Sequence, residues 1–227
     1  MKILITGAKG FVGKNLVASL EAIRDGKDRV HKIQGLENPE DLVLYTYDID
    51  SKPEELEDYC KDADFVFNLA GVNRPKNQEE FMKGNFGFAS TLLDTLKKYG
   101  NKAPVMLSSS IQASLEGRFA GSEYGKSKLA GEELFWKYSQ ENGVKVLIYR
   151  FPNLFGKWCR PNYNSAVATF YNNIANDLPI QVNDRKTELE LLYIDDLVEE
   201  MLLALNGKEH RDERDYCYCP LTYLAPL

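Results

Sequence analysis

Short apolar runs alternate with amphipathic runs along the first two thirds of the chain. Apolar runs typical of buried strands cover residues 2–6, 42–47, 65–70, 104–109 and 145–150. Segments with the periodicity of amphipathic helices cover residues 11–23, 53–60, 79–99 and 123–141. Because regular alternation of strands and helices builds a parallel sheet, the pattern predicts an α/β fold with a Rossmann-like, doubly wound parallel sheet.

Three further segments complete the predicted organisation. Residues 25–41 are rich in charge, glycine and proline, which indicates a surface excursion, and residues 189–196 read as a strand that runs into a helix capped by Asp195 or Asp196. We expect one NAD(P)-binding domain over residues 1–205, including a small substrate-binding region from about residue 152 onward. Residues 206–227 lose the pattern and are expected to form an irregular or truncated tail.

Composition and charge narrow the class of protein. The 227 residues are 44% hydrophobic and 27% charged, which is typical of a compact globular domain. A net charge of -6 without a basic cluster argues against nucleic-acid and membrane partners. No apolar run is long enough to cross a bilayer, so a cytoplasmic protein is expected. The four cysteines and two histidines match no metal-site or disulfide pattern, so we expect no metal.

A glycine-rich turn joins the first strand to the first helix. Residues 6–13 read Thr-Gly-Ala-Lys-Gly-Phe-Val-Gly, a G-x-x-G-x-x-G motif. Gly7 permits a tight turn, Gly10 lets backbone N–H groups approach a pyrophosphate, and Gly13 lets the helix pack closely on the sheet. The helix N-terminus then faces the anion. The motif predicts a dinucleotide site with contacts from Gly7, Lys9, Gly10, Phe11, Val12 and Gly13.

Asp48 follows the second predicted strand. Dinucleotide-binding folds place there the carboxylate that accepts the adenosine ribose hydroxyls. Asp48 and Asp50 are equally well placed to cap the helix that begins near Pro53. A carboxylate at this position would repel the 2′-phosphate of NADPH, and the sequence leaves NADH and NADPH both open as cofactors.

Tyr124 and Lys128 are four residues apart, so both lie on one face of the helix predicted at 123–141. A free phenol has a pKa of about 10, so proton exchange near neutral pH requires a nearby cation. Lys128 supplies that cation, and we expect it to lower the pKa of Tyr124. The strand before this helix ends in three serines, of which Ser110 is placed to hydrogen-bond a substrate carbonyl. Ser110, Tyr124 and Lys128 are the predicted catalytic residues.

These motifs together resemble the extended short-chain dehydrogenase/reductase family. The resemblance is carried by residues 6–13, 68–71 (Asn-Leu-Ala-Gly), 108–110, 124–128 and 150–153 (Arg-Phe-Pro-Asn). More narrowly, residues 70–75, 152–159 and 161–165 are similar to the reductase domain of two-domain enzymes that make UDP-N-acetylfucosamine for capsular polysaccharide. That resemblance implies an NAD(P)H-dependent reductase of the C4 ketone of a UDP-4-keto-6-deoxy amino sugar. It also implies a cupin epimerase domain, expected here to be separate or missing.

The resemblance also implies residue roles. Hydride passes from the nicotinamide to the sugar C4 while Tyr124 donates a proton, Ser110 orients the carbonyl oxygen, and Lys128 also holds the nicotinamide ribose. Further cofactor contacts are expected from Leu69, Ala70, Gly71, Ser108, Pro152 and Asn153. Candidates to bind the sugar and its diphosphate are Asn73, Arg74, Ser110, Asn153, Lys157, Arg160 and Arg185, although any one of these cations is as well explained as a solvated surface charge. A homodimer through residues 85–99 and 124–141 is expected by analogy.

Other functions share parts of this pattern. A nucleotide-sugar 4-epimerase with tightly bound NAD would use the same Ser110, Tyr124 and Lys128. A 4,6-dehydratase is disfavoured because Ile111 and Gln112 stand where that chemistry uses an acidic pair. A non-catalytic dinucleotide sensor would keep the glycine loop but would not need Tyr124 and Lys128.

Overall fold

The central sheet has five parallel strands. These are β1 (Lys2–Thr6), β2 (Val43–Tyr47), β3 (Phe65–Asn68), β4 (Val105–Ser110) and β5 (Val146–Phe151), in the order β2-β1-β3-β4-β5. The computed structural model describes residues 1–75, 77–182 and 186–226. The direction of winding reverses between β1 and β3, and crevices at such switch points hold ligands in open α/β sheets. The predicted doubly wound α/β fold is confirmed.

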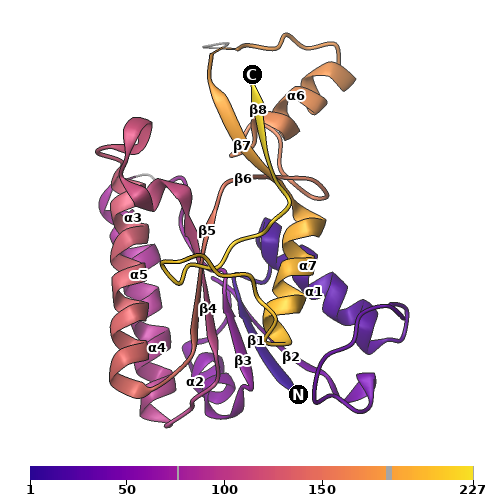
Figure 1. The fold of residues 1–227 in the computed structure, drawn as a ribbon, viewed down its shortest axis with the longest axis vertical. Helices are drawn as coiled ribbons and strands as arrows, with labels where there is room; N and C mark the ends of the chain where they lie inside the picture. Colours follow the sequence, from indigo (N-terminus) through magenta and orange to yellow (C-terminus); the bar gives the residue numbers. More distant parts are fainter. Residues whose placement is uncertain (76, 183–185, 227) are drawn as a thin grey trace.

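Helices cover both faces of this sheet. One face carries α1 (Phe11–Arg24) and α7 (Ile194–Leu205), and the other carries α2 (Pro53–Asp62), α4 (Phe88–Lys98) and α5 (Glu123–Asn142) (Figure 1). Alternate residues of one strand serve the two layers: Ile3 and Ile5 pack toward α1 and α7, while Leu4 packs toward α2 and α4. The strands are therefore apolar on both faces, which is why they read as continuous apolar runs in the sequence.

The segment predicted as one helix at 79–99 is divided. A short helix, α3 (Glu79–Phe81), passes into a π-helical turn (η2, Met82–Gly87) and then into α4. Asn85 lies in that turn, is buried, and hydrogen-bonds the backbone of Val72 through both its amide oxygen and its amide nitrogen. A wide turn of this kind turns a polar side chain inward without ending the helix.

Short 3-10 turns occupy parts of two loops. The excursion at 25–41 contains only η1 (Pro39–Asp41), in agreement with its prediction as irregular surface structure. Between β4 and α5 lie η3 (Ile111–Ser114) and η4 (Gly117–Phe119). The N-cap of α5 is Ser122, whose hydroxyl accepts the backbone N–H of Gly125 at 3.0 Å and so fixes where this helix begins.

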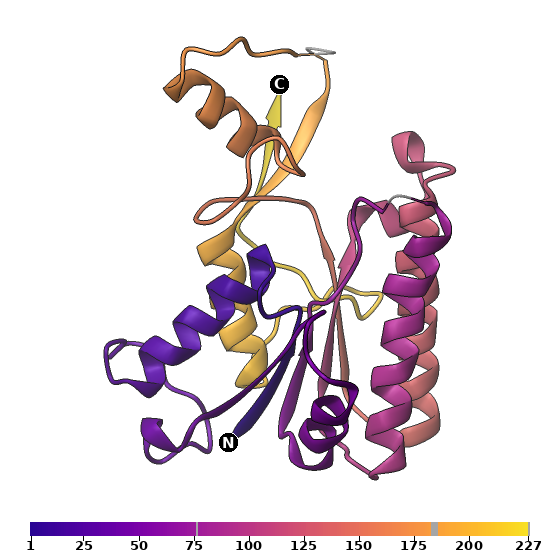
Figure 2. The same ribbon diagram turned by 180° about the vertical axis from the view of Figure 1, so that it is seen from behind.

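A small second sheet extends beyond the carboxyl ends of the parallel strands (Figure 2). It contains β6 (Asn153–Phe155), β7 (Glu188–Tyr193) and β8 (Thr222–Pro226), with β6 parallel and β8 antiparallel to β7. Helix α6 (Ala166–Ala175) lies beside it. The N-cap of α7 is Tyr193, so the prediction of Asp195 or Asp196 as the cap was wrong. Both aspartates lie in the first turn, where their negative charges interact favourably with the helix dipole.

The segment after α7 is more regular than its sequence pattern predicts. Cys217 forms an isolated parallel bridge with Tyr149, and its backbone N–H donates to the carbonyl of Ile148 at 2.9 Å. Strand β8 then pairs along β7. The sequence predicts an irregular tail because residues 206–215 are mostly polar and charged and residues 216–227 show no clear period; Tyr223 and Leu224 of β8 are exposed.

Two kinds of feature are absent from the part of the chain that the structure describes. It contains no helix that is both long and apolar enough to cross a membrane. Over the same residues, no group of histidine, cysteine, aspartate and glutamate side chains is arranged to hold a metal ion.

Candidate active site

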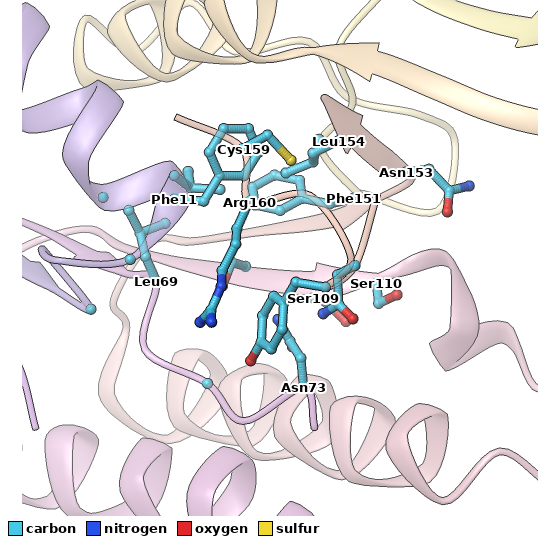
Figure 3. Close-up of a pocket in the computed structure, with 18 of the residues that line it drawn as sticks. Phe11, Leu69, Asn73, Ser109, Ser110, Phe151, Asn153, Leu154, Cys159 and Arg160 are labelled. Atoms are coloured by element: carbon cyan, nitrogen blue, oxygen red, sulfur yellow. The ribbon is translucent and has the colours of Figure 1, made fainter. Parts of the chain in front are cut away.

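A cavity of about 740 Å³ opens at the carboxyl ends of the parallel strands (Figure 3). The small extension contributes to its lining through Asn153 and Leu154 of β6 and through residues 158–160, 163 and 164, which lie between β6 and α6. Most residues predicted to bind cofactor or substrate line it: Gly7, Lys9, Gly10, Phe11, Val12, Gly13, Leu69, Gly71, Asn73, Ser108, Ser110, Tyr124, Lys128, Pro152, Asn153 and Arg160. The fold therefore gathers motifs that are far apart in the sequence around one space.

The glycine loop has the geometry of a phosphate cradle. Gly7 has φ +66°, and a Cβ atom there would lie 2.7 Å from the backbone nitrogen of Ala70. A Cβ atom on Gly13 would lie 2.2 Å from the carbonyl oxygen of Gly7. Helix α1 begins after Gly10 with neither a capping side chain nor an acidic residue in its first turn. Its N–H groups are thus available to an anion, and the loop fits the pyrophosphate of a dinucleotide.

The side chain of Asp48 is hydrogen-bonded to the backbone of this loop. Its carboxylate accepts the backbone N–H of Lys9 at 2.7 Å and that of Ile49 at 2.8 Å, while the Lys9 ammonium pairs with Asp50. Neither aspartate caps α2, because the N-cap is Lys52. The helix-cap interpretation was therefore wrong. The role of Asp48 toward the adenosine ribose stays a prediction, and the residue does not line the cavity.

The three predicted catalytic side chains converge at the end of β4. Lys128 is buried, and its Nζ donates to the carbonyl oxygen of Ser108 at 2.9 Å. The hydroxyl of Ser110 hydrogen-bonds the Tyr124 phenol and also accepts the backbone N–H of Gln112 at 3.2 Å. Ser109 points to the opposite face of the strand, toward α5, which supports the choice of Ser110 among the three serines.

The electrostatics of this group differ from the prediction. Burial raises the pKa of Tyr124 to about 12, and the hydrogen bond from Ser110 lowers it only in part. Burial also lowers the pKa of Lys128 to about 8, against a smaller raising effect of Glu132. The Lys128 Nζ lies 5.7 Å from the centre of the Tyr124 ring and is committed to the Ser108 carbonyl. In the protein alone, desolvation outweighs the lysine charge, so the expected lowering of the tyrosine pKa is not found.

Asn85 is a site residue that the sequence did not reveal. Its amide nitrogen donates to the hydroxyl of Ser127 at 2.9 Å. A Cβ atom on Gly71 would lie 2.9 Å from the Asn85 amide oxygen and 3.1 Å from the Lys128 Nζ. The Asn85 amide and the Lys128 ammonium therefore both lie next to Gly71. A lone asparagine inside a helical pattern carries no motif, and only the π-helical turn brings it to the site.

Basic and aromatic side chains lie at the opposite wall, which Arg160 and Tyr163 line and which Arg74 borders. The guanidinium groups of Arg74 and Arg160 lie 5.3 Å and 5.6 Å from the centre of the Tyr163 ring. Arg74 also donates to the Asn164 side chain at 2.9 Å. Figure 3 shows Arg160 extending into the cavity toward the loop after β3, which carries Leu69 and Asn73. Two cations therefore stand where an anionic group of a ligand would enter.

Some predicted residues lie beside the cavity without lining it: Asp48, Ala70, Arg74 and Lys157. The backbone N–H of Ala70 donates to the Thr6 hydroxyl at 3.2 Å, which holds the end of β3 beneath the glycine loop. The Lys157 ammonium lies 4.0 Å from the centre of the Trp158 ring. Arg185 falls outside the described residues.

Comparisons with known proteins agree with this geometry. The model of the NAD dependent epimerase/dehydratase family matches residues 3–217. A curated relative from Pseudomonas aeruginosa, UDP-2-acetamido-2,6-beta-L-arabino-hexul-4-ose reductase, is 42% identical over 208 residues, which cover 92% of this chain and 50% of the relative. The crystal structure of the capsular polysaccharide assembling protein CapF from Staphylococcus aureus is 43% identical, with a TM-score of 0.80 over 100% of this chain and 56% of that one.

A more distant structure shares the fold alone. UDP-glucuronic acid 4-epimerase from Bacillus cereus, solved in complex with NAD, is 21% identical, with a TM-score of 0.76 over 100% of this chain and 80% of the epimerase. The chain spans about half the length of the two more similar relatives.

Proposed function

Because the chain belongs to the NAD dependent epimerase/dehydratase family, we propose that it is an NAD(P)H-dependent reductase of the C4 ketone of a UDP-4-keto-6-deoxy amino sugar. The observation that carries the proposal is the meeting of Ser110, Tyr124 and Lys128 with the glycine loop around one cavity. The name of the Pseudomonas aeruginosa relative, a reductase of a UDP-linked hexulose, supports the same reaction. The name of the Staphylococcus aureus relative, a capsular polysaccharide assembling protein, supports a role of this reaction in capsular or surface polysaccharide synthesis.

Tyr124 is the proposed proton donor. When bound, the reduced nicotinamide supplies a hydride to the ketone carbon. The ketone oxygen then gains negative charge, and the Tyr124 hydroxyl donates a proton to it. Burial keeps this phenol protonated at neutral pH, because it raises the pKa to about 12. The acid form that reduction requires is therefore the form present.

Ser110 and Lys128 prepare the proton transfer. The Ser110 hydroxyl, fixed by the Gln112 backbone N–H and hydrogen-bonded to Tyr124, would hold the ketone oxygen beside the phenol. The Lys128 ammonium stabilises the phenolate left behind, because the attraction between these charges is strong in a buried site. Its three donors also allow it to hold a ribose hydroxyl while it keeps the Ser108 carbonyl.

The nucleotide-linked sugar is proposed to lie along the opposite wall. Arg74 and Arg160 flank Tyr163 and offer guanidinium groups to the diphosphate. Asn73 and Asn153 line the cavity nearer the catalytic residues and are assigned to the sugar. The Asn153 amide nitrogen donates to the Glu190 carbonyl at 3.0 Å, which fixes the orientation of this side chain. Lys157 and Arg185 remain further candidates for the phosphates.

Absorbance of the reduced nicotinamide tests the reaction. We expect steady loss of NADPH or NADH when the protein is mixed with a UDP-4-keto-6-deoxy amino sugar, and product reduced at C4 by mass spectrometry. Interconversion of C4 epimers with no net loss of reduced cofactor would instead indicate a 4-epimerase. Binding of the cofactor without turnover of any keto sugar would indicate a sensor. Either of these outcomes refutes the reductase.

A homodimer through α4 and α5 is a further proposal, and light scattering of the purified chain tests it. These two helices pack side by side on one face of the sheet, so a second copy would form a four-helix interface there. A monomeric mass at micromolar concentration would refute this assembly. A separate cupin epimerase partner is tested by adding such a protein and following exchange at the sugar C3.

A further inference from the structure

Glu132 is a fully buried carboxylate directly beneath the candidate active site. Arg150 binds it through two hydrogen bonds, of 2.9 Å from Nε and 2.6 Å from Nη2. The hydroxyls of Ser109 and Tyr216 donate to the same carboxylate at 2.5 Å and 2.9 Å. Four donors from three separate segments thus satisfy one buried charge. A single Arg150–Glu132 ion pair would leave some acceptor positions of the buried carboxylate without donors, and here the two hydroxyls fill them.

The position of Glu132 along α5 links it to the catalytic residues. Tyr124, Lys128 and Glu132 follow one another at intervals of four, so they share one face of the helix. Each contacts the end of β4: Tyr124 meets the Ser110 hydroxyl, Lys128 meets the Ser108 carbonyl, and Glu132 meets the residue between them. The helix and the strand are therefore pinned together at three successive points.

The charges around this carboxylate are unequal. Arg150 lies opposite Ser109 in the register of β4 and β5 and faces Glu132 directly. Lys128 lies one helical turn away, and its ammonium donates to the Ser108 carbonyl. Burial penalises its ammonium, and the Glu132 charge is what opposes that penalty. The other titratable groups that face the network are Tyr216 and, toward Arg150, Asp212.

We propose that Glu132 is a positioning residue of the reductase site: it fixes α5 against β4 and places a negative charge one helical turn from the Lys128 ammonium. The inference rests on the proposed function. Glu132 itself does not line the cavity, so its proposed role is to act through Lys128 and β4. A purely structural ion pair between Glu132 and Arg150 would predict a loss of stability without any change at Lys128.

The Glu132→Gln variant separates these two roles, because it keeps the size of the side chain and one of its two acceptor oxygens but removes its charge. We expect the midpoint for deprotonation of Lys128 to fall by about one pH unit, since one neighbouring opposite charge is lost. NMR of isotopically labelled lysine side chains measures this midpoint in the protein without cofactor or substrate, with Lys128→Met identifying the resonance. The alkaline limb of kcat for ketone reduction should move to lower pH by the same amount.

Glu200→Gln is the matched control. Glu200 is equally buried and accepts hydrogen bonds from Tyr149 at 2.8 Å and His210 at 2.7 Å, but it lies on α7, on the other face of the sheet. We expect it to lower stability without moving the Lys128 midpoint. An unmoved midpoint in Glu132→Gln, or an equal shift in Glu200→Gln, overturns the proposal.

Ser109→Ala keeps the charges of Glu132 and Arg150 and tests whether Glu132 positions α5 against β4. This variant is the deciding test if Glu132→Gln does not fold. It removes the hydrogen bond between Glu132 and β4 and, although Ser109 borders the cavity, it leaves the Ser110, Tyr124 and Lys128 side chains unchanged. We expect kcat to fall about tenfold with the substrate KM unchanged, because the reacting groups lose their alignment. Unchanged kcat would count against the proposal. A wild-type protein that reduces no keto sugar defeats the proposed function instead, and the NMR titration still reports on Glu132.

Discussion

The Asp48 carboxylate accepts the backbone N–H of Lys9 at 2.7 Å, and so the end of β2 holds the glycine loop in place. The loop amide that it occupies belongs to the same turn that would receive the cofactor phosphates. Asp48 therefore combines a structural task with its predicted task toward the adenosine ribose. If the prediction for the ribose holds, this one side chain couples cofactor preference to the order of the loop.

Asp48→Ala is expected to shift preference toward NADPH. Removal of the carboxylate relieves repulsion of the 2′-phosphate, and we expect the ratio of kcat/KM for NADPH over NADH to rise about tenfold. Asp64→Ala is the control, because the Asp64 carboxylate likewise accepts a backbone N–H, that of Lys2, at 2.7 Å, but does so where β1 begins. An unchanged ratio in Asp48→Ala would remove Asp48 from the cofactor site and leave it as a loop support.

Gly10→Asp should fold yet lose cofactor binding. A Cβ atom at Gly10 meets only the Gly7 carbonyl oxygen, at 3.1 Å, so the backbone accommodates it with a small shift. The added carboxylate would nevertheless stand at the N-terminus of α1, where the pyrophosphate binds. Calorimetry with NADPH measures the loss, and Gly10→Ala controls for the side chain alone. Undiminished affinity in a folded Gly10→Asp protein would show that the loop is not the phosphate site.

Tyr124→Phe should retain the fold and cofactor affinity but lose ketone reduction. Proton donation of this kind contributes about 10²–10⁴-fold, so kcat should fall by at least that factor. Lys128→Met should show a similar loss together with weaker cofactor binding, which fluorescence titration of NADPH measures. Near-normal turnover by Tyr124→Phe would contradict the assignment of this phenol as the acid.

The buried Lys128 ammonium predicts a pH-dependent stability. Its pKa is about 8 in the folded protein and 10.5 as a free side chain, so between these values the unfolded chain binds more protons and stability rises with pH. The stability advantage of Lys128→Met over wild type should therefore shrink as pH rises from 8 to 10.5, by up to about 3 kcal/mol. Urea unfolding at pH 7.5 and 9.5 measures the difference. A constant difference would mean that folding does not lower the pKa of Lys128, because only equal protonation of the folded and unfolded states makes stability independent of pH.

The sequence predicts the framework of the site because its signals are local. The strand ends and the helix at 123–141 fall within two residues of their predicted limits, since each buried strand is a continuous apolar run. Gly7, Tyr124 and Lys128 are recognisable because their spacing alone places them on a turn and on one helix face. For such residues, the spacing along the chain largely determines where the side chains lie relative to one another.

Residues whose surroundings come from distant segments were not predictable in this way. Glu132 and Arg150 look like ordinary charges on a helix and a strand, and only the packing of α5 on the sheet joins them. Asn85 depends on a π-helical turn that has no sequence signature. The pKa of Tyr124 was expected to fall because the charge of Lys128 is visible in the sequence, whereas the burial that raises it is not.

The bridge between Cys217 and Tyr149 also bears on how the chain assembles during synthesis. A parallel sheet ends in rows of unpaired N–H and carbonyl groups, and an open border of that kind is a template for pairing with other molecules. Here β5 forms that border, and the segment around Cys217 shields part of it by donating to Ile148. Until residue 217 has left the ribosome, the border stays unshielded, so the emerging chain is most prone to aggregation in the interval between the completion of β5 and the arrival of that segment.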